Sequence, residues 1–169
     1  MRDALIHLLQ LTWFMAPAYC ANMAPPFARF WPGWNRPINA RSLGSHKTTV
    51  GAVGGVLVAT AVALLQSRLG WRGSIVDYDQ WLLVGLLLGV GAMGGDLAKS
   101  YVKRRVGIAP GSRWVPADQL DFVIGALVLI APMARIGWLD VTLILAISFV
   151  GDLAVNQVAF RLGVRDTAW

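Results

Sequence analysis

The stretch GDLAKSYVKRRVGIAPGSRWVPADQLD, residues 95–121, decides the fold of the chain. It carries three acidic and five basic side chains, although one apolar run precedes it and another follows it. Lys and Arg gather where membrane-spanning helices end, because their long side chains reach the polar interface. The stretch therefore predicts that one spanning helix ends near residue 98 and that the next begins near residue 120.

The composition of the whole chain also indicates a membrane protein. Of its 169 residues, 56% are hydrophobic and only 14% are charged, and the mean hydropathy is +0.57. Soluble domains carry about 25% charged residues. The 18 Gly and 8 Trp suit membrane helices and the aromatic belts at their ends. Cys20 is the single cysteine, so an internal disulfide is excluded.

Five segments are candidates for crossing a bilayer, which takes roughly 20 apolar residues. They are residues 4–24, 49–66, 80–98, 120–134 and 138–162, of which the fourth is short. No internal repeat divides the chain, so residues 1–169 are expected to form one domain. The predicted fold class is an all-α integral membrane protein, a bundle of five transmembrane helices. Small-residue pairs, Gly51 with Gly55 and Gly85 with Gly89, are expected to let these helices approach closely.

The distribution of Lys and Arg predicts the orientation of this bundle. Basic residues are enriched in cytoplasmic loops. The loops 25–48 and 99–119 and the C-terminal tail together carry eleven of them, and the opposite side carries four. We therefore expect the N-terminus outside, the C-terminus inside, and the polar clusters on the cytoplasmic side of the inner membrane, where soluble nucleotides are available.

A polar stripe is expected if the helix of residues 80–98 continues past the membrane surface. Snorkelling explains its basic residues, but an aspartate attached to an apolar run is costly unless it is paired or binds a metal. Residues at spacings i, i+3, i+4 and i+7 share one helix face. The stripe consists of Asp96, Lys99, Ser100 and Lys103, with Arg104 and Arg105 beside it.

The sequence DQLD places two carboxylates on one face at the start of the next helix. Helix capping explains Asp118, but it does not explain Asp121, which lies one turn into an apolar segment. Paired carboxylates also suit Mg²⁺, which keeps waters and takes substrate phosphates as further ligands. Capping and metal binding both stay open for this pair alone. Asp96 and the nearby cations favour the metal, with Asp96, Asp118 and Asp121 as its ligands.

Three further segments offer groups for a phosphorylated substrate. Lys47 is a point charge in the loop GSHKTTVG, where hydroxyls such as that of Thr48 and the backbone N–H groups of a helix start could meet phosphate. The same hydroxyls are also ordinary helix caps. His46 is a candidate for phosphate binding or proton transfer. Asn22, between prolines, and Asn156, four residues after Asp152, complete the set.

Carboxylates, cations and hydroxyls that meet at a membrane surface suit phosphoryl or nucleotidyl transfer, in which cations neutralise a polyphosphate during an in-line attack. No Ser-His-Asp pattern, Cys/His metal spacing or Walker loop is present. Nucleic acid is not an expected partner, because the basic residues lie beside membrane spans. A CDP-alcohol phosphotransferase, or a transporter or lipid-binding subunit without catalysis, stay as alternatives.

Five stretches occur in the order found in one known family. They are PAYCANMAPP, HKTTVG, GDLAKSYVKRRVGIAPGS, DQLDF and, at the C-terminus, N...LGVRDTAW. Over nearly the whole chain the sequence resembles the CDP-archaeol synthases, integral membrane cytidylyltransferases related to the CDP-diacylglycerol synthases. It differs from the usual family pattern at Ser45, Val50 and Asp152. The excess of Arg over Lys and the many Trp favour a bacterial member from a GC-rich genome.

The resemblance implies a five-helix CTP:archaetidate cytidylyltransferase that uses Mg²⁺. A lipid phosphate, archaetidic acid or a lipid like phosphatidic acid, attacks the α-phosphorus of CTP, pyrophosphate leaves and a CDP-lipid remains. The expected partners are CTP, this lipid phosphate and the bilayer, and a homodimer is left open. The expected catalytic residues are Asp96, Lys103, Asp118 and Asp121. The expected substrate-binding residues are Asn22, His46, Lys47, Thr48, Lys99, Ser100, Arg104, Arg105 and Asn156.

Overall fold

The computed structural model describes residues 2–30, 33, 35–109 and 112–163. The regular elements of these residues are all helices, which loops connect, and an isolated β-bridge joins Pro37 and Thr48. The elements in chain order are α1 (Arg2–Met23), η1 (Pro25–Phe30), α2 (Ala40–Leu43), α3 (Thr49–Leu69), η2 (Tyr78–Gln80), α4 (Trp81–Arg105), α5 (Ala117–Ile130) and α6 (Trp138–Arg161). The prediction of an all-α protein is confirmed.

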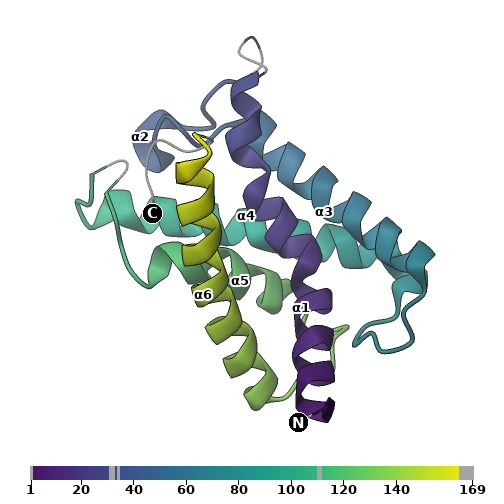
Figure 1. Ribbon diagram of the computed structural model, residues 1–169. Coiled ribbons are helices and arrows are strands. Elements are labelled where there is room, and N and C mark those ends of the chain that lie inside the picture. Colours follow the sequence, from purple (N-terminus) through teal and green to yellow (C-terminus); the bar gives the residue numbers. More distant parts are fainter. Residues whose placement is uncertain (1, 31–32, 34, 110–111, 164–169) are drawn as a thin grey trace.

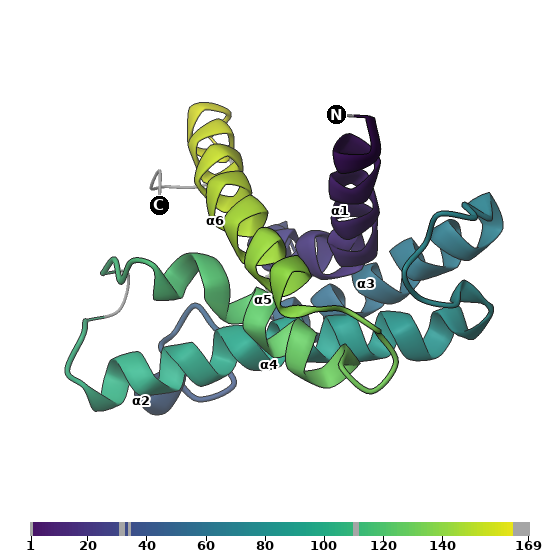
Figure 2. The same cartoon turned by 90° about the horizontal axis from the view of Figure 1, so that it is seen from below.

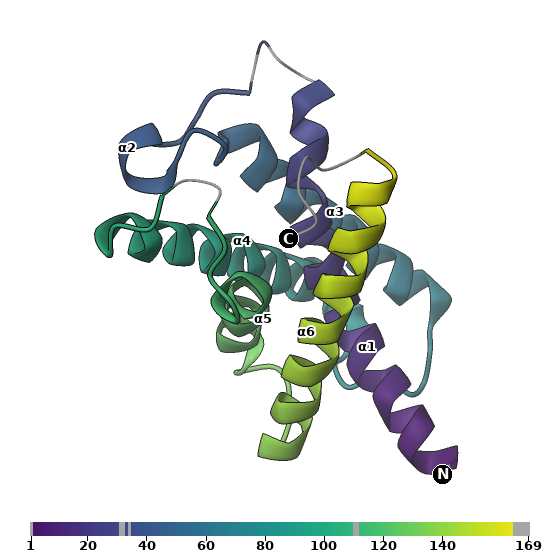
Figure 3. The same cartoon turned by 60° about the vertical axis from the view of Figure 1, so that its left-hand side comes forward.

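The long helices form a layer with two helices standing on it. α3 and α4 run antiparallel, and α5 packs antiparallel along α4 (Figure 1). α1 and α6 rise from one side of this layer (Figure 2). The buried core lies where they meet it and includes Phe14 of α1, Leu88 of α4, Phe122 of α5 and Ile144 of α6. Figure 3 shows α2 beside the C-terminal half of α4, on the side where the loop before α3 also lies.

Within the described residues, four helical stretches are long and apolar enough to cross a membrane: Arg2–Ala28, Thr49–Leu69, Tyr78–Arg105 and Trp138–Arg161. The fifth predicted segment, 120–134, is instead helical over Ala117–Ile130, which is 14 residues. At 1.5 Å per residue this helix is about 21 Å long, less than the roughly 30 Å of a hydrocarbon core. It ends just before Pro132, which cannot continue a helix. Five crossings therefore stay a prediction.

α4 is longer than the predicted segment 80–98, because it continues to Arg105. Its last turn carries Lys103, Arg104 and Arg105, and positive charge stabilises the C-terminal end of a helix dipole. The condition for the polar stripe, a helix that continues past residue 98, is thus met. All four stripe residues lie on one continuous helix.

Glycines set the distances between the central helices. A Cβ at Gly85 would lie 2.6 Å from the Cα of Thr60, so the predicted close approach of α4 to α3 is confirmed. A second crossing, between α4 and α5, was not predicted. There a Cβ at Gly95 would overlap the carbonyl oxygen of Asp121, and one at Gly125 would overlap that of Gly91. Backbone therefore touches backbone where α4 meets α5.

We expect Gly95→Ala to lower the free energy of unfolding by about 1–3 kcal/mol, because the added methyl group must push α5 away from α4. The matched control is Gly94→Ala on the same turn, where a Cβ meets nothing within 4 Å. Thermal unfolding of the purified protein in detergent measures both. Equal melting temperatures for the two variants would contradict the tight crossing.

Candidate active site

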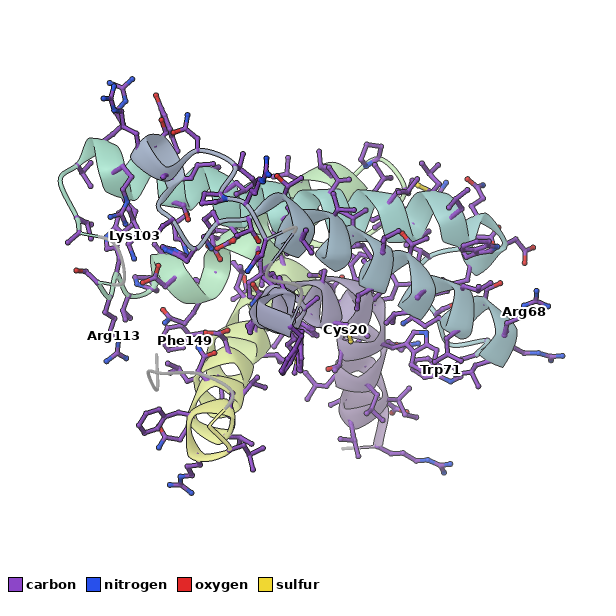
Figure 4. All side chains as sticks on the ribbon, turned by 90° about the horizontal axis from the view of Figure 1, so that it is seen from above. Cys20, Arg68, Trp71, Lys103, Arg113 and Phe149 are labelled. Atoms are coloured by element: carbon purple, nitrogen blue, oxygen red, sulfur yellow. The ribbon has the colours of Figure 1, made fainter. Side chains whose placement is uncertain are left out.

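A cavity of about 360 Å³ opens where five parts of the chain converge. They are the C-terminal end of α1, the loop before α3, the second half of α4, the first turn of α5 and the second half of α6. Figure 4 shows Lys103 and Arg113 at this end of the molecule and Arg68 and Trp71 at the opposite end. The predicted site residues that line the cavity are Asn22, His46, Lys47, Thr48, Asp96, Lys99, Ser100, Lys103, Arg104, Asp118 and Asn156.

Lys99 lies at the centre of the three predicted metal-binding aspartates. Its Nζ is 2.7 Å from Oδ2 of Asp121, 3.0 Å from Oδ1 of Asp118 and 3.4 Å from Oδ1 of Asp96. The side chain of Asp121 is only 5% exposed. The α4–α5 crossing explains the convergence, since Gly95, next to Asp96, touches the backbone of Asp121. We call Asp96, Asp118 and Asp121 the carboxylate cluster.

Lys47 joins the loop before α3 to this cluster. Its Nζ donates to both carboxylate oxygens of Asp96, at 2.6 Å to Oδ1. The loop is held in place by backbone bonds, because N–H of Ile38 donates to the carbonyl of Lys47 at 2.9 Å and N–H of Thr49 to that of Arg36 at 3.2 Å. A loop distant in sequence thereby supplies a cation to the end of α4.

Lys103 fastens the loop that precedes α5. It is 6% exposed, and its ammonium donates to the carbonyl of Ser112 at 2.6 Å and to both oxygens of Asp118 at 2.9 and 3.1 Å. The backbone N–H of Trp114 also donates to Asp118, at 2.6 Å. Burial raises the pKa of Asp118, but the bonds from Lys103 and the charge of Lys99 outweigh it and hold that pKa below its usual value. The carboxylate is therefore ionised at neutral pH.

His46 and Thr48, in the loop before α3, differ in what their side chains offer. Burial, with the charge of Lys47 beside the ring, lowers the pKa of His46, so the imidazole is neutral at pH 7. A neutral imidazole still donates one hydrogen bond and accepts another, so phosphate binding and proton transfer by His46 both stay predictions. Thr48 is the N-cap of α3, and its Oγ1 accepts a hydrogen bond from the N–H of Gly51 at 3.2 Å. Its hydroxyl hydrogen remains available as a donor toward the cavity.

Two neighbouring arginines were both predicted to bind substrate, and the structure separates them. Arg104 lines the cavity, and its Nε and Nη1 are buried without a hydrogen-bond partner among the residues that the structure describes. Arg105 lies outside the cavity lining, with its Nε donating to the hydroxyl of Tyr101 at 3.0 Å and its guanidinium over that ring. Arg104 thus keeps unpaired donors at the cavity, whereas Arg105 is held on the surface of α4.

Sequence reasoning missed Gln119. It is 1% exposed, lines the cavity and keeps Oε1 without a partner in the described part of the chain. Gln119 lies between the two predicted aspartates of DQLD, but its helical spacing from them does not predict that it faces the same cavity. On α6, Asn156 is buried and donates to Oδ2 of Asp152 at 2.8 Å. Ser100 is buried at 2% exposure, and Asn22 is half-buried at the end of α1.

The carboxylate cluster offers oxygen ligands to a divalent cation, but it is not preformed around one. Within the described ranges, no three carboxylate, imidazole or thiol groups stand ready to hold a metal ion directly. The carboxylate cluster is spaced around an ammonium instead. Its hard oxygen donors nevertheless suit Mg²⁺. Oδ2 of Asp121 meets Lys99 without hydrogen-bond geometry, so one buried oxygen has spare capacity for a cation. The chemistry of the cluster fits Mg²⁺ once the ammonium moves.

Comparisons with known proteins agree over nearly the full length. Residues 4–169 match the model of the family described as CarS-like, CDP-archaeol synthase. The CDP-archaeol synthase of Thermococcus onnurineus is 33% identical, and the alignment covers 98% of this chain and 99% of the relative. That of Methanosphaerula palustris is 35% identical, with 92% and 100% covered.

A solved structure of an intramembrane enzyme for archaeal membrane lipids biosynthesis matches with a TM-score of 0.76 and 29% identity, and the match covers 88% of this chain and 94% of that one. The relatives above are archaeal. The bacterial source expected from the composition stays a prediction.

We expect Lys103→Met to lower the free energy of unfolding by about 1–3 kcal/mol, because the carbonyl of Ser112 loses its ammonium partner and Asp118 keeps only Lys99 and the N–H of Trp114. The loop 106–116 should also become easier to cleave in limited proteolysis. Arg105→Met removes the same charge from the surface of α4 and serves as the control. If both variants unfold at the wild-type temperature, Lys103 does not fasten the loop.

Proposed function

Because the chain belongs to the CDP-archaeol synthase family, we propose that this cavity is where it transfers a cytidylyl group from CTP to a lipid phosphate. The protein is a nucleotidyltransferase of membrane lipid biosynthesis that acts on archaetidic acid. The observation that carries the assignment of the site is the convergence of two carboxylates, Asp96 and Asp118, and four cations at one cavity of a membrane-embedded helix bundle. The third carboxylate, Asp121, lies outside the cavity lining and is paired to Lys99. The four cations are Lys47, Lys99, Lys103 and Arg104.

The reaction is a displacement at the α-phosphorus of CTP. An oxygen of the lipid phosphate forms the new bond, the bond from the α-phosphorus to the bridging oxygen of the β-phosphate breaks, and pyrophosphate leaves with the electron pair. A phosphate monoester already carries a negatively charged oxygen near neutral pH, so no general base is required.

Different residues of the chain are assigned to bind different parts of the substrate. Arg104, with its unpartnered N–H groups, is the strongest candidate for the triphosphate oxygens, since a guanidinium donates two parallel bonds to a phosphate. Lys47 and the hydroxyl of Thr48 border the same space. Asn22, Ser100 and Asn156 supply uncharged polar groups around it. Lys103 positions Asp118 and its loop rather than reaching for phosphate.

We assign the carboxylate cluster as the holder of Mg²⁺. Bound there, Mg²⁺ supplies charge neutralisation for the polyphosphate and for the leaving pyrophosphate. Asp118 is kept ionised by Lys103 and Lys99 and is therefore ready to act as a ligand. Asp121 and Asp96 approach from the other sides of the same point.

The helix ends that meet at the cavity support five crossings with the N-terminus outside. The C-terminal parts of α1, α4 and α6 and the N-terminal parts of α3 and α5 all border the cavity, which is the alternation that five successive crossings require. At the far end, His7 near the start of α1 bonds Asp140 near the start of α6 at 2.7 Å. Eleven of the fifteen Lys and Arg fall in the segments 25–48 and 99–119 and the C-terminal tail, which the sequence assigns to one side. Because the first two of these segments supply residues to the cavity lining, we propose that the cavity faces the cytoplasm.

Purified protein given CTP, Mg²⁺ and a panel of lipid phosphates tests the reaction. We expect pyrophosphate release only when both lipid and Mg²⁺ are present. Asp121→Asn should reduce that rate by at least about 100-fold, as expected for a lost metal ligand, while the protein still inserts and purifies. Asp79→Asn, an exposed position between α3 and α4, is the control. Full activity in Asp121→Asn would remove the metal site.

Labelling of single cysteines in intact cells tests the topology. In a Cys20→Ser background, Arg72→Cys should react with a membrane-impermeant maleimide, because the loop between α3 and α4 is proposed to face outward. Ser45→Cys should react only after the membrane is permeabilised. The reverse pattern would invert the orientation, and equal labelling of both positions in intact cells would contradict an odd number of crossings between them.

A further inference from the structure

Lys99 differs from the other cations of the site in how it is held. Lys103 is bonded to the carbonyl of Ser112 as well as to Asp118, and Lys47 sits on a loop that backbone bonds fix in place. Within the described part of the chain, the ammonium of Lys99 contacts only the carboxylate cluster. It is therefore held by ion pairs and a hydrogen bond to carboxylates alone, at the end of a flexible four-carbon stem.

The charges of the cluster are already balanced. The three carboxylates face the ammonium groups of Lys47, Lys99 and Lys103. A divalent cation added to this set would create an excess of positive charge in a largely buried place, which is costly unless a cation leaves. Lys99 is the group that can leave, because Lys103 is also bonded to the carbonyl of Ser112 and Lys47 meets Asp96 alone, whereas the Nζ of Lys99 stands at the point which all three carboxylates approach.

We propose that Lys99 is a positioning residue that holds the carboxylate cluster together in the metal-free protein and gives up its place when a divalent cation binds. The inference rests on the proposed function. Lys99 also lines the cavity, so a short rotation of its stem carries the ammonium toward the space assigned to the triphosphate. The same charge then stabilises two states in turn: the assembled carboxylates without metal, and the phosphate oxygens of CTP with metal.

Binding of Mn²⁺ to the full-length protein in detergent, followed by the electron paramagnetic resonance signal of free Mn²⁺, tests the exchange without CTP or lipid. Lys99→Met should bind Mn²⁺ at least roughly tenfold more tightly than wild type, since a competing cation a few ångströms away has been removed. Its melting temperature without metal should fall, because three carboxylates are left to repel one another. Mn²⁺ should then raise that temperature more in the variant than in wild type.

Two controls separate exchange from a general change of charge. Arg105→Met removes one cation from the surface of α4 and should leave Mn²⁺ binding unchanged. Lys103→Met should give a smaller gain in affinity than Lys99→Met, or a loss, because it also frees the loop that holds Asp118. Mn²⁺ binding to Lys99→Met that is equal to or weaker than wild type overturns the proposal, because a merely structural lysine would give that result.

A measurement on the wild-type protein decides the case if Lys99→Met does not fold. A small water-soluble acylating reagent, with mass spectrometry of the peptides, should modify Lys99 faster when Mn²⁺ is present. Lys103 should stay unreactive, because its three donors remain bonded. Unchanged reactivity of Lys99 overturns the exchange. Protein that binds Mn²⁺ and shows the exchange but releases no pyrophosphate would count against the proposed function alone.

Discussion

The burial of three carboxylates at one end of a helix bundle is the constraint on which the rest of the structure depends. Ionised carboxylates are costly away from water unless cations and hydrogen bonds surround them. Here the cations come from α4 and from the loop before α3, and a backbone N–H comes from the loop before α5. Two loops that could otherwise take many conformations are thereby fixed against the helices, and the cavity between them acquires its walls.

This constraint explains why several lysines of the site point toward carboxylates. From their positions at the membrane interface alone, they would be expected in solvent. A lysine at a helix end usually reaches the headgroups. Lys103 instead turns inward and is among the most buried charged groups of the described chain. Its partner Asp118 stays ionised for the same reason. The remaining cation with unpartnered donors, Arg104, then has an anionic substrate as its natural complement.

The sequence was sufficient for the helices and for naming most of the residues that meet at the cavity, whose roles stay predictions. Apolar length identified four of them, and the i, i+3, i+4, i+7 spacing from Asp96 to Lys103 correctly placed a polar stripe on α4. It was insufficient where tertiary contacts decide. The contact of Gly95 with the backbone of Asp121 has no local sequence signal. A glycine allows close helix packing, but the sequence does not say which helix will pack against it. Arg104 and Arg105 are chemically identical neighbours, and only the direction of each side chain separates their roles.

The backbone contact between α4 and α5 has a mechanical consequence. Membrane helices adjust to bilayers of different thickness by tilting. A pair of helices in contact through glycine backbone has no side chains to repack at the contact. When such helices tilt, each is therefore expected to rotate about the contact. Asp96 and Asp121 lie next to the pivot, where the lever arm is shortest. If both helices cross the bilayer, we expect their far ends, near residues 81 and 130, to take up the displacement and the distance between the two carboxylates to change little with lipid chain length.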